Sequence, residues 1–313
     1  EKSKEKPEIK KIAKKKKNLR NGNVYRQNSY GCKKALMIES YQWEGSEKKV
    51  MKKLYYLIRM TFQTKFAYIK AFWFNIFGTA VSILIYYFLW KYVFQSRDEL
   101  NGFTAVEITT YVIISRLLSS QFSGGINREF SEWVQKGNIV VELLRPVPLV
   151  FTLFGKRVGE FLFFILFKGI PVSILATFIL GGTGPDGAAN FALFLVSVFI
   201  SIGLMFWIEV MVGLISFFTL NSYGIGYTKT ALMSILSGGI VPLFLFPEGV
   251  AKVLDYMPFA GMVSVPVHIY LGKYTAAEAF SFIGLQIIWV ALLGIGVMAF
   301  YRFAIKKVVV QGG

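Results

Sequence analysis

The chain has 313 residues, of which 54% are hydrophobic and 17% aromatic, whereas charged residues make up only 17%. With its long uninterrupted apolar runs, this composition excludes an ordinary water-soluble domain and is typical of a polytopic membrane protein. The formal net charge is +17, and the single cysteine and single histidine exclude an intrachain disulfide and any site built from several histidines.

Residues 1–50 are predicted to form a basic, flexible extension, because they hold 15 basic and six acidic side chains. Such a tail could bind nucleic acid, but beside membrane spans we favour contact with anionic lipid and control of topology, and we expect no nucleic-acid partner. Met51-Lys52-Lys53 resembles a bacterial protein start. We therefore expect residues 1–50 to be either an atypical extension or the result of a mis-set start, and residues 51–313 to form the membrane domain.

The stretch 51–70 is predicted to be an amphipathic helix. At about 100° per residue, Lys52, Arg59, Gln63 and Lys70 fall close to one line, and mostly apolar side chains lie opposite. Lys65 sits among those apolar residues and weakens the pattern. A basic face opposite an apolar face suits a helix lying in the cytoplasmic membrane interface. The alternative is a plain lead-in to the first span.

Six apolar runs are predicted to cross the bilayer as helices, since the hydrocarbon core requires about 20 residues. They cover residues 71–94, 104–123, 151–180, 190–220, 228–246 and 276–303. We therefore expect an all-α polytopic membrane protein. If the N-terminus is cytoplasmic, basic side chains after the first span lie mainly on the inside, as the positive-inside rule requires. Both termini are thus predicted to be cytoplasmic.

The segment 247–273 lies outside in this scheme. It is too apolar for an ordinary solvated loop and too interrupted by Pro247, Pro258 and Pro266 to span the membrane. Two interpretations stay open. The segment forms either outer re-entrant helices packed on protein or an amphipathic helix on the membrane surface.

The chain carries no motif that indicates catalysis. GTGPDG at 182–187 matches GxGxxG literally, but it follows a membrane span and contains turn residues, so we do not expect a dinucleotide site. Phosphate-binding, zinc-protease and serine-hydrolase motifs are absent from the sequence. His268 has no evident catalytic partner and is interpreted as structural. We expect no enzyme activity, no metal and no cofactor on this chain.

Three charged residues fall deep within the predicted spans, namely Arg116, Lys168 and Glu209. Such residues usually face a protein interior or a polar cavity, which indicates either a polar pathway or an interhelical ion pair. Snorkelling toward the interface is the alternative for Arg116 and Lys168. Gly155 and Gly159 form a GxxxG match, and the two basic residues between them make it a weak signal of helix contact.

INREFSEWVQKGNIVVELLRPVP connects the second and third spans. The pattern predicts a short amphipathic helix with Phe130, Trp133 and Val134 on one face, ended by the Gly137–Asn138 pair. An apolar run follows and stops at an Arg-Pro-x-Pro stretch. These features fit either a compact knob for a soluble partner or a simple interfacial loop.

Four features together carry a family resemblance. They are the amphipathic helix at 51–70, the Gly-x-Ile…Leu-Leu-Arg-Pro-Val insert at 137–147, the proline-rich segment 247–273 and the C-terminal KKVVVQGG. With them the chain resembles type 2 ATP-binding-cassette (ABC) transporter permeases over residues 51–313, and one poorly characterised branch in particular. Residues 1–50 match nothing in the family pattern.

The resemblance implies that the region 127–136 is a coupling helix seated on a separate ABC ATPase subunit, which would hold ATP and Mg²⁺. The residues expected to dock this ATPase are Glu129, Phe130, Trp133, Val134, Lys136, Gly137 and Arg145. It also implies a second permease subunit, identical or paralogous, surrounded by membrane lipid.

The expected function is export of a hydrophobic or amphipathic small-molecule, peptide or lipid substrate across a bacterial plasma (inner) membrane. Two alternatives stay open: a channel or secondary transporter that uses the intramembrane charges, and a membrane-embedded enzyme.

Overall fold

The structure is a computed structural model, and it describes residues 47–96, 98–123, 125–145, 147–219 and 223–305. Almost all of the predicted extension at 1–50 and the whole C-terminal KKVVVQGG stretch lie outside the described residues. Among those described, four helical segments are long and apolar enough to cross a membrane: Ile69–Ser96, Leu149–Leu180, Gly187–Ile215 and Ala276–Ile305. The chain is therefore an all-α polytopic membrane protein, as predicted.

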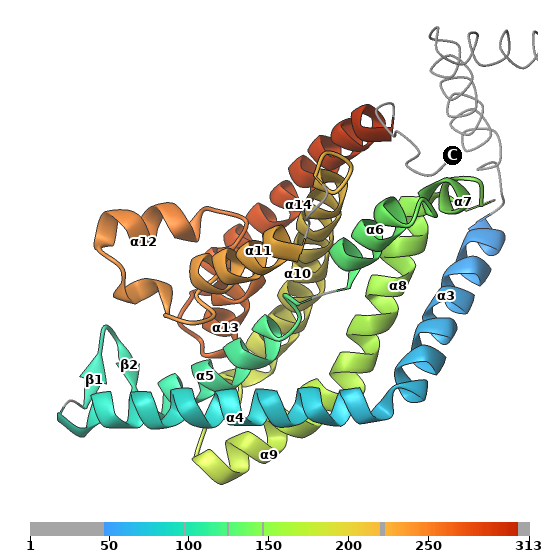
Figure 1. The fold of residues 1–313 in the computed structure, drawn as a ribbon. Helices are drawn as coiled ribbons and strands as arrows, with labels where there is room; N and C mark the ends of the chain where they lie inside the picture. The colour runs from blue at the N-terminus through green and yellow to red at the C-terminus, as the bar shows by residue number, and fades with distance from the viewer. Residues whose placement is uncertain (1–46, 97, 124, 146, 220–222, 306–313) are drawn as a thin grey trace, which may run out of the picture.

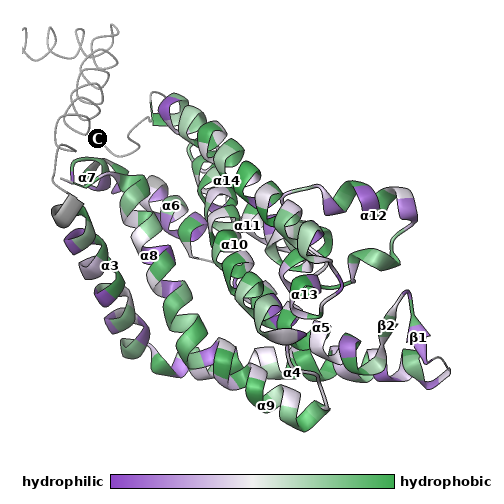
Figure 2. Cartoon of the chain, turned by 180° about the vertical axis from the view of Figure 1, so that it is seen from behind, coloured by the Kyte–Doolittle hydropathy of each residue, from purple (hydrophilic) through white to green (hydrophobic). Residues whose placement is uncertain are grey.

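The elements follow one another mostly as helices joined by short turns (Figure 1). In chain order they are α3 (Glu47–Ala67), α4 (Ile69–Val93), η1 (Phe94–Ser96), β1 (Glu99–Leu100), β2 (Phe103–Thr104), α5 (Ala105–Ser119), α6 (Ile126–Gln135), α7 (Ile139–Leu143), α8 (Leu149–Phe164), η2 (Ile165–Gly169), α9 (Ile170–Leu180), α10 (Gly187–Ile215), α11 (Tyr223–Leu236), η3 (Leu243–Leu245), α12 (Glu248–Asp255), η4 (Ala260–Met262), α13 (Ser264–Tyr270) and α14 (Ala276–Ile305). Figure 2 shows that α9, α10 and α14 are strongly hydrophobic, whereas α3 and α12 are mixed.

Two of the six predicted spans form shorter helices than predicted. The run 104–123 gives α5 of 15 residues, and the run 228–246 gives α11 of 14 residues. The second helix stops because Gly238 adopts a left-handed backbone, with φ of 79°, and Pro242 follows soon after. The sequence stays apolar beyond this glycine, so the predicted span extends further than the helix. The count of six crossings stays a prediction.

Helices α3 and α8 pack closely side by side. A Cβ on Gly155 would lie 2.7 Å from the side chain of Leu57, and a Cβ on Gly159 would lie 2.9 Å from Thr61. Further along, phenylalanine rings of the two helices meet edge to face. Since the contacts advance along both chains together, the helices are parallel. The GxxxG match therefore marks a close helix contact, whereas a position of α3 in the membrane interface stays a prediction.

Helix α10 is central to the fold, because it contacts α6, α8, α13 and α14. The hydroxyl of Ser197 donates to Oε1 of Gln286 at 3.1 Å, and a Cβ on Gly294 would lie 3.1 Å from the ring of Trp207. These pairs again advance together, so α10 and α14 are parallel neighbours. A displacement of α10 would therefore act directly on these four helices.

The connections between successive long helices lie alternately at opposite ends of the molecule (Figure 1). At one end, the side chain of Asn101 in the β1–β2 turn donates to the carbonyl of Phe244 at 2.9 Å, and the backbone N–H of Asp186 donates to the carbonyl of Tyr270 at 3.0 Å. At the other end lie α6, α7 and the start of α3. Successive membrane crossings produce this alternation.

The segment 247–273 folds into short helices, and its three prolines occupy different positions relative to these helices. Pro247 precedes α12, Pro258 lies in the turn after it, and Pro266 is buried within α13. Helix α13 packs inside the protein against α10, as the re-entrant interpretation requires. Helix α12 instead exposes Val253, and Tyr256 directly after it is exposed as well, as expected of a surface helix. The membrane depth of both helices stays a prediction.

Candidate functional site

The connection between α5 and α8 holds the amphipathic helix predicted from sequence. In α6, Ile126, Phe130 and Trp133 follow one another at helical spacing, so they share one face. Ile126 and Phe130 are buried in a hydrophobic cluster with Leu214 of α10. Gly137 takes φ of 70° and separates α6 from α7. The predicted break therefore lies where the sequence placed it.

Phe130 is fully enclosed, with 0% of its side chain exposed. A Cβ on Gly213 of α10 would lie only 2.7 Å from Cδ2 of Phe130, so this glycine makes room for the ring. The ring of Phe217 meets it edge to face at 6.1 Å, and the hydroxyls of Ser131 and Ser216 lie 3.0 Å apart. Phe130 was expected to dock a partner, and the structure places it instead as the residue that fastens α6 to α10.

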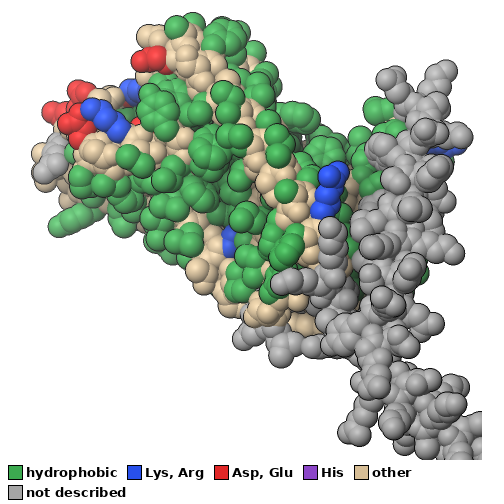
Figure 3. Space-filling model, turned by 90° about the horizontal axis from the view of Figure 1, so that it is seen from above, with side chains coloured by type: hydrophobic (Ala, Val, Ile, Leu, Met, Phe, Trp, Pro, Cys, Tyr) green, Lys and Arg blue, Asp and Glu red, His purple; other side chains and the backbone are tan. Residues whose placement is uncertain are grey.

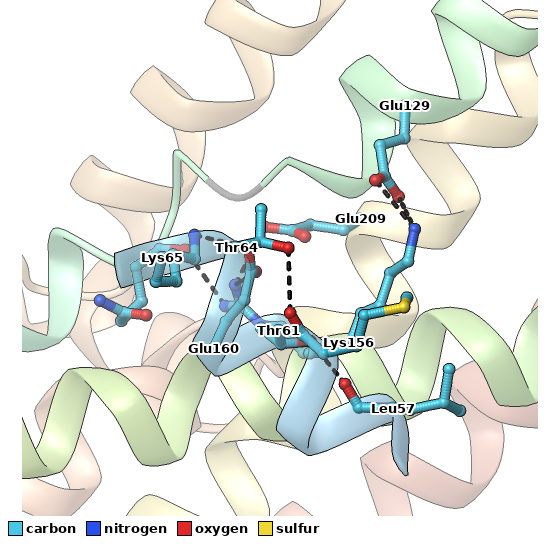
Figure 4. A network of polar contacts seen from close by, with 11 residues as sticks. Leu57, Thr61, Thr64, Lys65, Glu129, Lys156, Glu160 and Glu209 are labelled. Carbon is cyan, nitrogen blue, oxygen red and sulfur yellow. Dashed lines mark hydrogen bonds and ion pairs between the residues drawn. The ribbon is translucent and has the colours of Figure 1, made fainter. Parts of the chain in front are cut away.

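A second contact joins α6 to α8. Nζ of Lys156 lies 3.0 Å from Oε1 of Glu129 (Figure 4). The same atom lies 5.3 Å from the centre of the Trp133 ring. One lysine thus combines an ion pair with a cation–π contact. Both Glu129 and Trp133 keep part of their surface open.

The opposite side of the insert is open to the surroundings. Lys136 and Arg145 are exposed, each in an ion pair with a nearby glutamate of the insert. Val141 and Leu144 are exposed apolar residues on or just after α7. The side chain of Val134 lies outside the described part of the structure. The insert therefore has one fastened face and one free face.

Behind α6, Glu209 is fully buried between two cations from two other helices. Its Oε1 lies 3.6 Å from Nζ of Lys229 on α11 and 3.9 Å from Nη1 of Arg157 on α8. Lys229 donates to the carbonyl of Phe122 at 2.9 Å, and Arg157 donates to the carbonyl of Gln121 at 3.1 Å. Three helices and the segment that leads into α6 are thus linked through one carboxylate.

The deep position of Glu209 in the sequence indicates either a polar pathway or an interhelical ion pair, and the structure shows ion pairs with two residues that the sequence did not identify as its partners. Neither Arg157 nor Lys229 is among the deep charges predicted from sequence. Comparing the depths of charged residues along the predicted spans could have identified Arg157, because Arg157 and Glu209 both lie within predicted spans, toward the cytoplasmic end of each.

Arg116 and Lys168 lie in separate surroundings. The guanidinium of Arg116 donates to the carbonyl of Gly239 and lies 4.4 Å from the centre of the Tyr86 ring. Nζ of Lys168 donates to Oδ1 of Asn75 at 2.6 Å and to the hydroxyl of Ser120 at 3.0 Å. Neither cation pairs with Glu209, so the three deep charges form no single ion-pair network among the described residues.

The arrangement suits transmission of motion rather than bond chemistry. Within the described ranges, no group of three His, Cys, Asp and Glu side chains could hold a metal ion. His268 contacts the rings of Phe103, Tyr111 and Tyr274 and hydrogen-bonds the carbonyl of Ser264 at 2.7 Å. Its burial lowers its pKa to about 4, so it is neutral and structural at ordinary pH.

Comparison with known families identifies the family of this chain. A model described as ABC-2 family transporter protein matches residues 80–312. This chain belongs to the ABC-2 transporter family. The match runs from within α4 through the whole insert to the C-terminal stretch. A search of curated proteins found no significant match. The ABC-2 assignment makes the chain the membrane-spanning permease subunit of an ABC transporter.

Proposed function

We propose that α6 and α7 form the surface on which a separate ABC ATPase subunit docks, and that the docked insert passes motion to α10 and α8. The observation that carries this proposal is the two-faced insert. Phe130 is enclosed against Gly213 on one side, while Lys136, Val141, Leu144 and Arg145 are open on the other. ABC-2 permeases associate with ABC ATPase subunits, and a rigidly held exposed helix is a suitable contact for one.

The physical basis of coupling is a shift between two conformations of the permease. ATP and Mg²⁺ bind on the partner, and closure of the ATPase subunits moves whatever is docked on them. Because Phe130 is fully buried and packs closely against Gly213, α6 cannot move far without α10. Close-packed interiors transmit displacement in this way rather than absorbing it. Glu209, with its links to α8 and α11, extends the moving unit to two more helices.

The proposed activity is export of a hydrophobic or amphipathic substrate across a bacterial plasma membrane, with both termini in the cytoplasm. A second permease subunit, identical or paralogous, would complete the pathway, and apolar side chains at their interface would meet the substrate. The chain offers such a surface, because hydrophobic side chains cover much of the described part of the face drawn in Figure 3.

An ion channel gains no support from the deep charges. Arg116 on α5, Lys168 in η2 and Glu209 on α10 each have separate contacts. A conduction path would need polar groups in succession across the membrane. We therefore propose ATP-driven transport alone.

Two matched lysines test the docking proposal. Lys136 at the end of α6 pairs with Glu132 at 3.4 Å, and Lys252 on α12 pairs with Glu248 at 2.7 Å, each four residues apart on an exposed surface. Lys136→Glu should reduce the amount of ATPase subunit that copurifies with the permease, whereas Lys252→Glu should not. Equal copurification of both variants with wild type would contradict the proposed docking surface.

A further inference from the structure

A cavity of about 490 Å³ lies between α3, α4 and α8, next to the segment that leads into α6. Its charged lining consists of four cations and two carboxylates: Lys65, Lys156, Arg157, Lys168, Glu129 and Glu160. The transport mechanism proposed above does not use this space. Its composition indicates what it binds.

Two of the cations are already matched. Nζ of Lys65 lies 2.8 Å from Oε1 of Glu160, and Nζ of Lys156 lies 3.0 Å from Oε1 of Glu129 (Figure 4). Beyond the cavity wall, Glu209 is shared by Arg157 and by Lys229, which does not line the cavity. The whole cluster therefore holds five cations against three carboxylates, and an excess of two positive charges remains.

Lys168 carries one of these unmatched charges. Only 2% of this residue is exposed, and its contacts are neutral: Oδ1 of Asn75 at 2.6 Å, the hydroxyl of Ser120 at 3.0 Å and the ring of Phe164 at 5.9 Å. Lys168 lies in the π-helical turn η2, a rare backbone form that recurs at functional sites. A buried charge with no countercharge is unfavourable unless a ligand supplies one.

Arg157 adds an unused donor to the same wall. The residue is 1% exposed, and its Nε has no hydrogen-bond partner among the described residues. An oxyanion in the cavity would lie beside Arg157 and neutralise the charge of Lys168. Phosphate-type oxyanions have several acceptor oxygens and the required charge.

The rest of the lining is aromatic and apolar. Phe72, Phe163 and Phe164 form part of the wall, and the exposed residues Met60 and Tyr68 lie at the mouth. The cavity also borders α4, a helix apolar enough to cross the membrane. A ligand that enters beside a lipid-facing helix and meets both cations and aromatic rings is an amphiphile with a charged head.

We propose that this cavity binds the phosphate-containing headgroup of an anionic membrane lipid, with Lys168 and Arg157 contacting the oxyanion and the aromatic wall contacting the adjoining apolar part. The inference is independent of the docking proposal, because binding requires neither ATP nor an ATPase subunit. It assigns a ligand class to a cavity and a role to a deep lysine that ion pairing within the protein does not explain.

The experiment uses the purified full chain in a neutral detergent. The probes are dihexanoyl phosphatidylglycerol, its zwitterionic phosphatidylcholine counterpart and inorganic phosphate, each titrated while the thermal unfolding midpoint is followed and bound lipid is counted by native mass spectrometry. Phosphatidylglycerol should raise the midpoint of the wild type, whereas phosphatidylcholine should not.

Lys168→Met should weaken phosphatidylglycerol binding about 10-fold or more, because it removes one charge-assisted contact. Without lipid this variant should be at least as stable as wild type, since the uncompensated buried charge is gone. Lys168→Arg should retain binding. Lys65→Gln, a change at the partly exposed edge of the cavity that leaves Glu160 only its 3.9 Å ion pair with Arg157, should also weaken it, and Lys252→Met on distant α12 should have no effect.

Equal responses of wild type and Lys168→Met to phosphatidylglycerol would overturn the proposal. So would equal stabilisation by phosphatidylcholine. If inorganic phosphate at the same concentration reproduced the whole effect, the site would take a free oxyanion and the assignment to a lipid would be wrong.

Discussion

The close packing of Phe130 against Gly213 allows a direct test of how α6 is attached to α10. In Gly213→Ala, the new Cβ would lie 2.7 Å, 3.0 Å and 3.1 Å from three atoms of the Phe130 side chain. That side chain is 0% exposed and cannot swing into solvent. Overpacking of this kind costs about 1–3 kcal/mol. We expect the added methyl group to push α6 away from α10.

The matched control is Gly296→Ala in α14, where an added Cβ meets nothing within 4 Å. Replacement of a helical glycine by alanine ordinarily stabilises by about 1 kcal/mol. Gly213→Ala should therefore fall below Gly296→Ala by about 1–3 kcal/mol in the free energy of unfolding, measured by denaturant titration in detergent. Adding Phe130→Leu to Gly213→Ala should restore part of the loss, because the smaller side chain makes room for the methyl group.

The coupling of ATPase activity to the permease should rank the two glycine variants in the same order as their stability does. In proteoliposomes that contain the permease with its ATPase, Gly213→Ala should reduce coupling of ATPase activity to the permease about five-fold or more, a typical size for a lost coupling energy. Gly296→Ala should behave as wild type. If both glycine variants had the same stability and the same coupling, the close contact of Phe130 with α10 would not be what transmits motion.

Three further predictions concern other contacts. Gly159→Leu should lower the thermal unfolding midpoint in detergent, because its side chain needs space that Thr61 on α3 occupies; an unchanged midpoint would show that α3 is not held there. Glu209→Gln should lower the free energy of unfolding by about 3–5 kcal/mol, since it leaves Arg157 and Lys229 buried without their shared carboxylate; a neutral effect in a denaturant titration would argue against the ion pair. The pKa of His268 is lowered to about 4 from the ordinary 6.5, so its contribution to stability is present above pH 6.5 and is lost as the pH falls toward 4. His268→Gln should flatten that part of a stability–pH curve, and a curve unchanged by the substitution would refute it.

The main features of the insert could be predicted from sequence because they depend on local patterns. Apolar residues at helical spacing define α6, and Gly137 ends it whatever the rest of the chain does. The direction of the apolar face could not be predicted. In a membrane protein such a face can meet lipid, a partner or the protein core, and only the packing of Gly213 against Phe130 decides for the core.

Tertiary contacts also explain the other differences. Charge patterns showed that Glu209 needs a partner, but whether Arg157 or Lys229 reaches it depends on the rotation and depth of three helices. The end of α11 depends on the left-handed backbone of Gly238, which a hydropathy average treats as one more apolar residue. The apolar stretch 240–246 does not continue α11 and contains only the short 3₁₀ helix Leu243–Leu245.

The most direct test of the central claim is site-specific photo-crosslinking in native membranes. A photoreactive residue replaces either Leu144, which is exposed beside α7, or Val253, which is exposed on α12 at the opposite end. If α6 and α7 carry the contact with the motor of this ABC-2 permease, the probe at Leu144 will crosslink to the ATPase subunit and the probe at Val253 will not. Crosslinking from Val253 alone, or from neither position in a complex that hydrolyses ATP, would contradict the account.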